Sequence, residues 1–131
     1  MNRQEVFDKV WDHFVTKGKP LSVSAKGSCF YRGPKGERCA FGVLIPDRLY
    51  DPNMDAFGGV RASSLLRWYP DVAEYLGAEV SYEEATGDML FIDDLQTAHD
   101  RVAKGDADWL EAGIEGSLRE LADRYDLVVP A

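Results

Sequence analysis

The apolar residues at the start of the chain recur at helical spacing. This spacing predicts an amphipathic helix over residues 3–17, whose buried face consists of Val6, Phe7, Val10, Trp11, Phe14 and Val15. Gly18 is a natural C-terminal stop for such a helix, and Pro20 prevents its continuation because proline lacks a backbone N–H.

The second half of the chain predicts further helices. Short helices are expected over 63–69 and 70–77, since Pro70 suits a first helical position and a glycine ends the second segment. A longer helix is expected over 88–103, with an apolar face of Leu90, Phe91, Leu95, Ala98 and Val102. The last helix is expected over 107–125, with a stripe of Trp109, Leu110, Ile114, Leu118, Leu121 and Tyr125.

Residues 21–41 have an extended pattern instead. The stretches SCFYR and ERCAF flank the turn signal GPKG, which predicts a β-hairpin over about 27–41. Symmetric pairing about this turn would bring Cys29 near Ala40. Together these elements indicate one α+β domain over residues 1–131, mostly helical, with a small hairpin.

The segment CAFGVLIPDRLYDPNMD, residues 39–55, is the most unusual part of the sequence. Its apolar start fits either a buried strand or a short buried helix. Pro46 limits it, and Asp47 suits the first turn of a single helical turn, followed by a loop. We expect a buried elbow in which Gly42 permits close packing and Tyr50 hydrogen-bonds across the bend.

Charge is divided unequally along the chain. Residues 1–40 contain eight Lys or Arg and four Asp or Glu, whereas residues 41–131 contain seven and nineteen. An acidic surface repels nucleic acid but suits solvation or docking on a basic protein, so direct nucleic-acid binding is not the expected main role. The sequence has neither a membrane-length apolar run nor an apolar signal-peptide core, and we expect a cytoplasmic protein.

Cys39 is the candidate nucleophile. A thiolate is stabilised at a helix N-terminus or beside a cation, and Arg38 precedes Cys39. His99 would act as the base, with Asp100 or Asp47 as the orienting acid. The alternative is that Cys39 is a small core residue, since cysteine is among the most buried residue types. The sequence leaves both open and favours the core interpretation.

Motifs for metals and cofactors are missing from the sequence. Cys29, Cys39, His13 and His99 match no compact zinc spacing. The stretch beginning at Asp51 starts like a calcium loop but lacks its glycine and its closing glutamate. We therefore expect no metal and no cofactor.

Three stretches resemble a known family: GKP at 18–20, CFYRGPKGERCAFGVLIPDRLYDPNM at 29–54, and LQTAHD at 95–100. This is a family of small uncharacterised proteins found in bacteriophages, prophages and bacterial genomes. Its members often carry Glu-Gly after the methionine, where this chain has Asp55 and Ala56. The resemblance implies a phage or mobile-DNA setting but no particular activity.

Charge and resemblance together predict a small acidic binding protein of phage or mobile-element type, acting in the host cytoplasm. It would dock on a basic protein, such as a host nucleic-acid-binding complex, and inhibit or modulate it in an anti-CRISPR-like manner. The expected contact residues are Asp93, Asp94, Glu111 and Glu115.

Two alternatives stay open. The first is a thiol enzyme built on Cys39, His99 and Asp100. The second is an assembly protein that self-associates through Trp68 and Tyr69.

Overall fold

The described part of the chain is helical. The computed structural model describes residues 1–22, 30–33, 35–55 and 61–130. Its α-helices are α1 (Arg3–Trp11), α2 (Ala40–Leu44), α3 (Ala62–Trp68), α4 (Pro70–Leu76), α5 (Gly87–Ala103) and α6 (Gly113–Tyr125). Shorter turns are the π-helical η1 (Asp12–Thr16) and the 3₁₀ turns η2 (Asp47–Leu49), η3 (Pro52–Asp55) and η4 (Ala107–Trp109).

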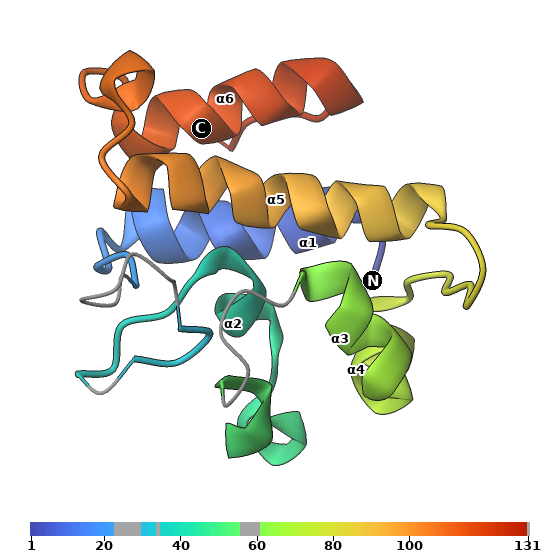
Figure 1. The fold of residues 1–131 in the computed structure, drawn as a ribbon. Coiled ribbons are helices and arrows are strands. Elements are labelled where there is room, and N and C mark those ends of the chain that lie inside the picture. Colours follow the sequence, from blue (N-terminus) through green and yellow to red (C-terminus); the bar gives the residue numbers. More distant parts are fainter. Residues whose placement is uncertain (23–29, 34, 56–60, 131) are drawn as a thin grey trace.

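Helix α5 is the centre of the arrangement. It contacts α1, α2, α3 and α6, and Figure 1 shows α6 on one side of it and α2 and α3 on the other. The apolar faces of these helices meet in one core, whose fully buried aromatic side chains are Phe7, Phe41 and Phe91. The core therefore joins the N-terminal helix, the elbow segment and the C-terminal helix pair.

The first predicted helix is confirmed, as α1 followed directly by η1. Asn2 caps α1 by accepting from the Glu5 backbone N–H at 2.8 Å, while the Glu5 carboxylate accepts from the Asn2 N–H at 3.2 Å. Gly18 stops the helix with a φ of +61°, the left-handed conformation that favours glycine.

The predicted helices of the second half are confirmed as α3, α4, α5 and α6, with changes at particular positions. Helix α6 begins at Gly113 rather than at residue 107, because Gly113 has a φ of +63° and interrupts the helix there. Leu90 and Leu110, both expected on buried faces, are 51% and 68% exposed.

The prediction of an α+β fold was wrong, because the described residues form an all-α arrangement without a sheet. Among the described residues, the predicted hairpin is reduced to one isolated antiparallel bridge, Arg32–Arg38, beside a turn in which the Gly33 N–H donates to the Glu37 carbonyl at 2.7 Å. A parallel bridge joins Arg38 to Leu21, which lies outside the predicted hairpin. Part of the hairpin, including Cys29, lies outside the described residues.

Side chains take the backbone donors that a hairpin would have used. The Asp55 carboxylate accepts from the backbone N–H groups of Tyr31 and Arg32, at 2.7 and 3.2 Å. The Gln96 side-chain oxygen accepts from the Phe41 N–H at 2.9 Å, at the start of α2. Pairing between the two stretches therefore does not extend beyond an isolated bridge, because the Tyr31 and Phe41 donors bond to side chains instead.

Candidate functional site

The elbow segment, residues 39–55, folds around its own backbone. The stretch from Cys39 to Ile45 is buried, and α2 is the short buried helix that the sequence left as one of two possibilities. A Cβ on Gly42 would lie 2.7 Å from the Tyr31 carbonyl carbon, so only glycine fits. Tyr50 donates its hydroxyl hydrogen bond to Asp55, which confirms the expected bond across the bend.

Arg32, which precedes the elbow segment in the chain, contacts three of its residues. Its guanidinium lies 4.3 Å from the ring centroid of Tyr50, and Nη2 donates to the Ile45 carbonyl at 2.9 Å. The same nitrogen pairs with the Asp47 carboxylate at 2.9 Å, and Arg38 approaches that carboxylate at 3.6 Å. Asp47 therefore forms ion pairs with these two arginines, and the carboxylate that contacts His99 is that of Asp100.

Cys39 caps helix α2. The residue is fully buried, and its Sγ accepts from the Gly42 N–H at 3.4 Å. The sulfur thus lies at a helix N-terminus, as the nucleophile hypothesis requires. It also lies in the core, as the competing hypothesis requires.

His99 is fully buried and holds two hydrogen bonds. Its Nε2 accepts from the Ser22 backbone N–H at 3.2 Å, and its Nδ1 lies 2.9 Å from the Asp100 carboxylate. Asp100 also accepts from the Gln96 amide at 2.7 Å. Because Gln96 in turn accepts from Phe41, a polar chain connects α5 to the start of α2, the helix that Cys39 caps.

The chain contains a cysteine, a histidine and a carboxylate, as a thiol enzyme requires, but Cys39 and His99 are fully buried. Asp100 orients the His99 ring as an acid partner would, but the other ring nitrogen already accepts from a backbone N–H. A general base needs that lone pair to take a proton. The catalytic roles of Cys39, His99 and Asp100 stay a prediction, and the contacts give each residue a structural role.

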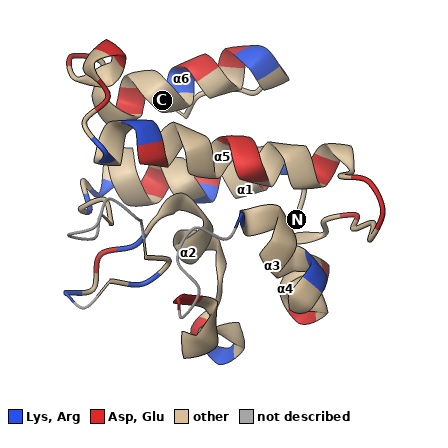
Figure 2. Cartoon of the chain, in the orientation of Figure 1, with Lys and Arg blue, Asp and Glu red and all other residues tan. Residues whose placement is uncertain are grey.

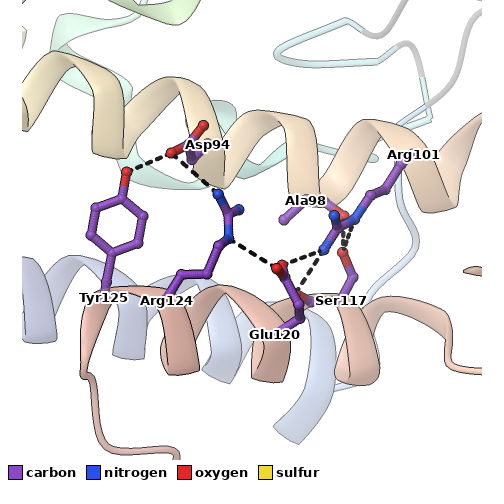
Figure 3. A network of polar contacts seen from close by, with 7 residues as sticks. All are labelled: Asp94, Ala98, Arg101, Ser117, Glu120, Arg124 and Tyr125. Atoms are coloured by element: carbon purple, nitrogen blue, oxygen red, sulfur yellow. Dashed lines mark hydrogen bonds and ion pairs between the residues drawn. The ribbon is translucent and has the colours of Figure 1, made fainter.

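Three of the four expected partner-binding residues bond within the chain, and two of them, Asp93 and Asp94, bond to other helices. Asp93 accepts from the Ser63 N–H at 2.9 Å, at the first turn of α3. Asp94 accepts from the Tyr125 hydroxyl at 2.5 Å and lies 3.8 Å from Arg124. Figure 3 shows that this contact continues along α5 and α6 through Glu120 and Arg101.

Glu111 and Glu115 lie on an exposed acidic turn that joins α5 to α6 and includes the first turn of α6, where Glu115 pairs with Arg119 at 3.2 Å. We define the acidic turn as Asp106, Asp108, Leu110, Glu111 and Glu115, all of which are exposed. Arg101 on α5 fixes the position of this turn, because its guanidinium stacks 3.6 Å from the ring centroid of Trp109 and pairs with Glu120 on α6 at 3.0 Å. Figure 2 shows acidic residues gathered at this turn, at one end of α5.

Two hollows lie on the surface formed by the described residues. A groove of about 530 Å³ lies between the η2–η3 segment, including Asp51, and the α3–α4 junction, including Trp68 and Asp71. A smaller hollow, of about 360 Å³, lies between the start of α1 and helices α4 and α5. The sequence did not indicate the larger groove, because its two walls are separate in the chain and meet only in the fold.

Burial and nearby carboxylates raise the pKa values of several tyrosines. Burial, with the hydrogen bond to Asp55, raises the pKa of Tyr50 to about 12. Burial, with the hydrogen bond to Asp94, raises the pKa of Tyr125 to about 12. Burial also raises the pKa of Tyr31, which the charges of Cys39 and Asp55 increase further. The hydroxyls of Tyr50 and Tyr125 are held as hydrogen-bond donors to carboxylates.

The described residues contain neither a metal-binding cluster nor a helix suited to a membrane. In this part of the chain, no group of three or more His, Cys, Asp or Glu side chains is placed to hold a metal ion. Within residues 1–22, 30–33, 35–55 and 61–130, no helix has the length and apolar character needed to cross a membrane.

Comparison with known proteins gave no relative. No family model matches the chain, and neither the curated proteins nor the solved structures contain a match. Function must therefore be inferred from the residues themselves.

Proposed function

We propose that this chain is a small binding protein that docks an acidic surface on a basic protein. The proposed partner is a host nucleic-acid-binding complex in the cytoplasm, which the chain inhibits or modulates in the manner of a phage-encoded anti-defence protein. The main support for this proposal is the acidic turn. It combines exposed carboxylates with an exposed leucine, and the stacking of Arg101 on Trp109 fixes it to α5.

The chemistry of the acidic turn suits a basic protein surface. Leu110 is 68% exposed, and the exposed residues Asp106, Asp108 and Glu111 lie within four positions of it in the chain. Protein interfaces commonly combine an apolar centre with a polar rim. Carboxylates around such an anchor favour a partner whose surface evolved to attract phosphates, and they repel nucleic acid itself.

The burial of the elbow supports binding over catalysis. Cys39 and His99 are fully buried, whereas an enzyme must bring its reacting groups to a substrate. A thiol enzyme remains the second candidate, because the His99–Asp100 hydrogen bond at 2.9 Å is the orienting contact such a site needs.

The experiment measures DNA binding by purified host nucleic-acid-guided effector complexes, in the presence of the wild-type chain and of a Glu111→Lys, Glu115→Lys variant. We expect the wild-type chain to release DNA from one such complex. The variant should weaken this effect by about tenfold or more, since opposite charges across an interface are replaced by like charges. Rising salt should weaken the wild-type effect.

Glu74→Lys is the matched control. Glu74 is exposed on α4, and the substitution makes the same kind of charge change far from the acidic turn. Equal loss in Glu74→Lys and in a single Glu111→Lys variant would assign the effect to net charge and contradict the proposed contact. Absence of any effect across the panel would contradict the proposed partner class.

A further inference from the structure

The larger groove combines an exposed indole with carboxylates that lack a cation. Trp68 is 59% exposed, and among the described residues no aromatic ring or cation is stacked on it. Asp71 is exposed at the first turn of α4 and has no ion-pair partner within the described part of the chain. An exposed tryptophan beside a carboxylate is a favourable place for a cation, since the face of the indole ring is negative.

Asp51 provides a second carboxylate from the opposite wall. It accepts from the Asn53 N–H at 2.9 Å and from the Tyr69 hydroxyl at 3.4 Å, and neither donor carries a charge. The Tyr69 contact links the two walls of the groove. Burial raises the pKa of Tyr69, as does the charge of Asp51, so the hydroxyl stays a donor that holds this carboxylate in place.

Arg48 also lines the groove, but its guanidinium lies 5.7 Å from the ring centroid of Tyr75 on α4. With one arginine against Asp51 and Asp71, the groove keeps an excess of negative charge. A ligand cation in the groove would be attracted by both carboxylates and repelled by Arg48.

The same chemistry occurs elsewhere in the molecule with the cation in place. Arg101 stacks on Trp109 at 3.6 Å and pairs with Glu120 at 3.0 Å. Arg32 stacks on Tyr50 at 4.3 Å and pairs with Asp47 at 2.9 Å. In both cases the cation is an arginine, whose planar guanidinium stacks on a ring while its N–H groups reach a carboxylate.

We propose that the groove binds an arginine side chain of a basic protein partner. The guanidinium stacks on the Trp68 indole and pairs with Asp71 and Asp51. This inference rests on the proposed function for the nature of the partner, and it adds a second contact, remote from the acidic turn. An arginine in this groove and basic residues at the acidic turn would fix the orientation of the complex.

The test is a titration of the ¹⁵N-labelled full chain with a blocked peptide of alternating arginine and glycine. A matched peptide carries citrulline, which has the shape of arginine without its charge. We expect the arginine peptide to shift the Trp68 indole N–H and the Asp71 amide in a saturable way, and the citrulline peptide to leave both unchanged. No shift of these signals up to about 10 mM peptide would overturn the proposal.

Substitutions in the groove test whether each side chain strengthens or weakens binding of the arginine peptide. Trp68→Ala and Asp71→Asn should each weaken peptide binding by about fivefold, and Arg48→Ala should strengthen it about twofold. All three side chains are exposed, and each variant is checked for an unchanged spectrum outside the groove. Unchanged affinity in Asp71→Asn, or equal shifts with citrulline, would overturn the charge-based account.

Two controls assign the peptide effect to the groove. The Glu111→Lys, Glu115→Lys variant should bind the peptide as the wild type does, because it leaves the groove intact. Failure of the effector experiment with retained peptide binding would reject the proposed function alone. A Trp68 signal that changes with protein concentration before peptide is added would identify a second copy of the chain as the occupant and overturn the proposal.

Discussion

Gly42 in helix α2 packs directly against the main-chain carbonyl of Tyr31, and a Cβ at position 42 would lie 2.7 Å from that carbonyl carbon. We expect Gly42→Ala to lower the free energy of unfolding by about 3 kcal/mol, because backbone on both sides must move to admit the methyl group. Urea unfolding, followed by circular dichroism, measures this loss.

Gly18→Ala is the comparison for that experiment. Gly18 has a φ of +61° and open space around its Cα, so its alanine variant carries only the backbone penalty of about 1 kcal/mol. Equal losses in the two variants would mean that Gly42 has no packing role, and the close contact with Tyr31 would be refuted.

The contact between Tyr125 and Asp94 predicts a pH dependence. Burial and this hydrogen bond raise the pKa of Tyr125 to about 12 from an ordinary value of 10.0. The folded protein therefore holds this proton more tightly than the unfolded chain. Stability that is complete below pH 10 is lost as the pH rises through about 12. Unfolding free energies measured at increasing alkaline pH should fall through this window.

Asp94→Asn tests the cause of that shift. Removing the carboxylate charge should lower the pKa of Tyr125, while that of Tyr50, which bonds to Asp55, should stay near 12. Phenolate absorbance, with Tyr50→Phe and Tyr125→Phe variants for assignment, reads the two residues separately. A Tyr125 pKa that is the same with and without the Asp94 charge would refute this account.

Helices could be predicted from the sequence because burying one face imposes a period that is visible locally. The faces of α1 and α5 follow this rule, and Gly18 and Pro70 mark a helix end and a helix start where expected. The error at Leu90 came from counting every apolar residue as part of the buried face: the face runs through Phe91, Leu95 and Ala98, whereas Leu90 points away from it and is 51% exposed.

The hairpin could not be judged from sequence, because its fate depends on distant side chains. The Asp55 carboxylate and the Gln96 amide take backbone donors at Tyr31, Arg32 and Phe41. Nothing in the local sequence of these stretches shows that such acceptors will be nearby.

Charged positions were the least predictable part of the candidate site. Asp93 and Glu111 look alike in sequence, yet Asp93 bonds to the first turn of α3 and Glu111 faces solvent. A carboxylate reveals its role only when the neighbouring elements are known. The proposed contacts on the acidic turn and in the groove therefore depend on the fold.

Gln96 should contribute to stability more than its position on α5 suggests. Its side chain accepts from the Phe41 N–H and donates to Asp100, so Gln96→Ala leaves a backbone donor at the start of α2 without this partner. We expect a loss of about 2 kcal/mol in unfolding free energy. The adjacent Thr97 is exposed, and Thr97→Ala should change stability by less than about 0.5 kcal/mol. Comparable losses in both variants would contradict the bridging role of Gln96.

The reactivity of Cys39 decides between the buried elbow and the thiol enzyme. Cys39 is fully buried as the cap of α2, so alkylation requires the surrounding core to open. We expect its alkylation in the native protein at neutral pH to be slower than that of a small thiol by about a hundredfold or more. Site-resolved mass spectrometry distinguishes it from Cys29, and urea should restore a normal rate. Rapid alkylation that slows in His99→Ala would instead mean that His99 activates the sulfur, and the thiol-enzyme hypothesis would then replace the binding proposal.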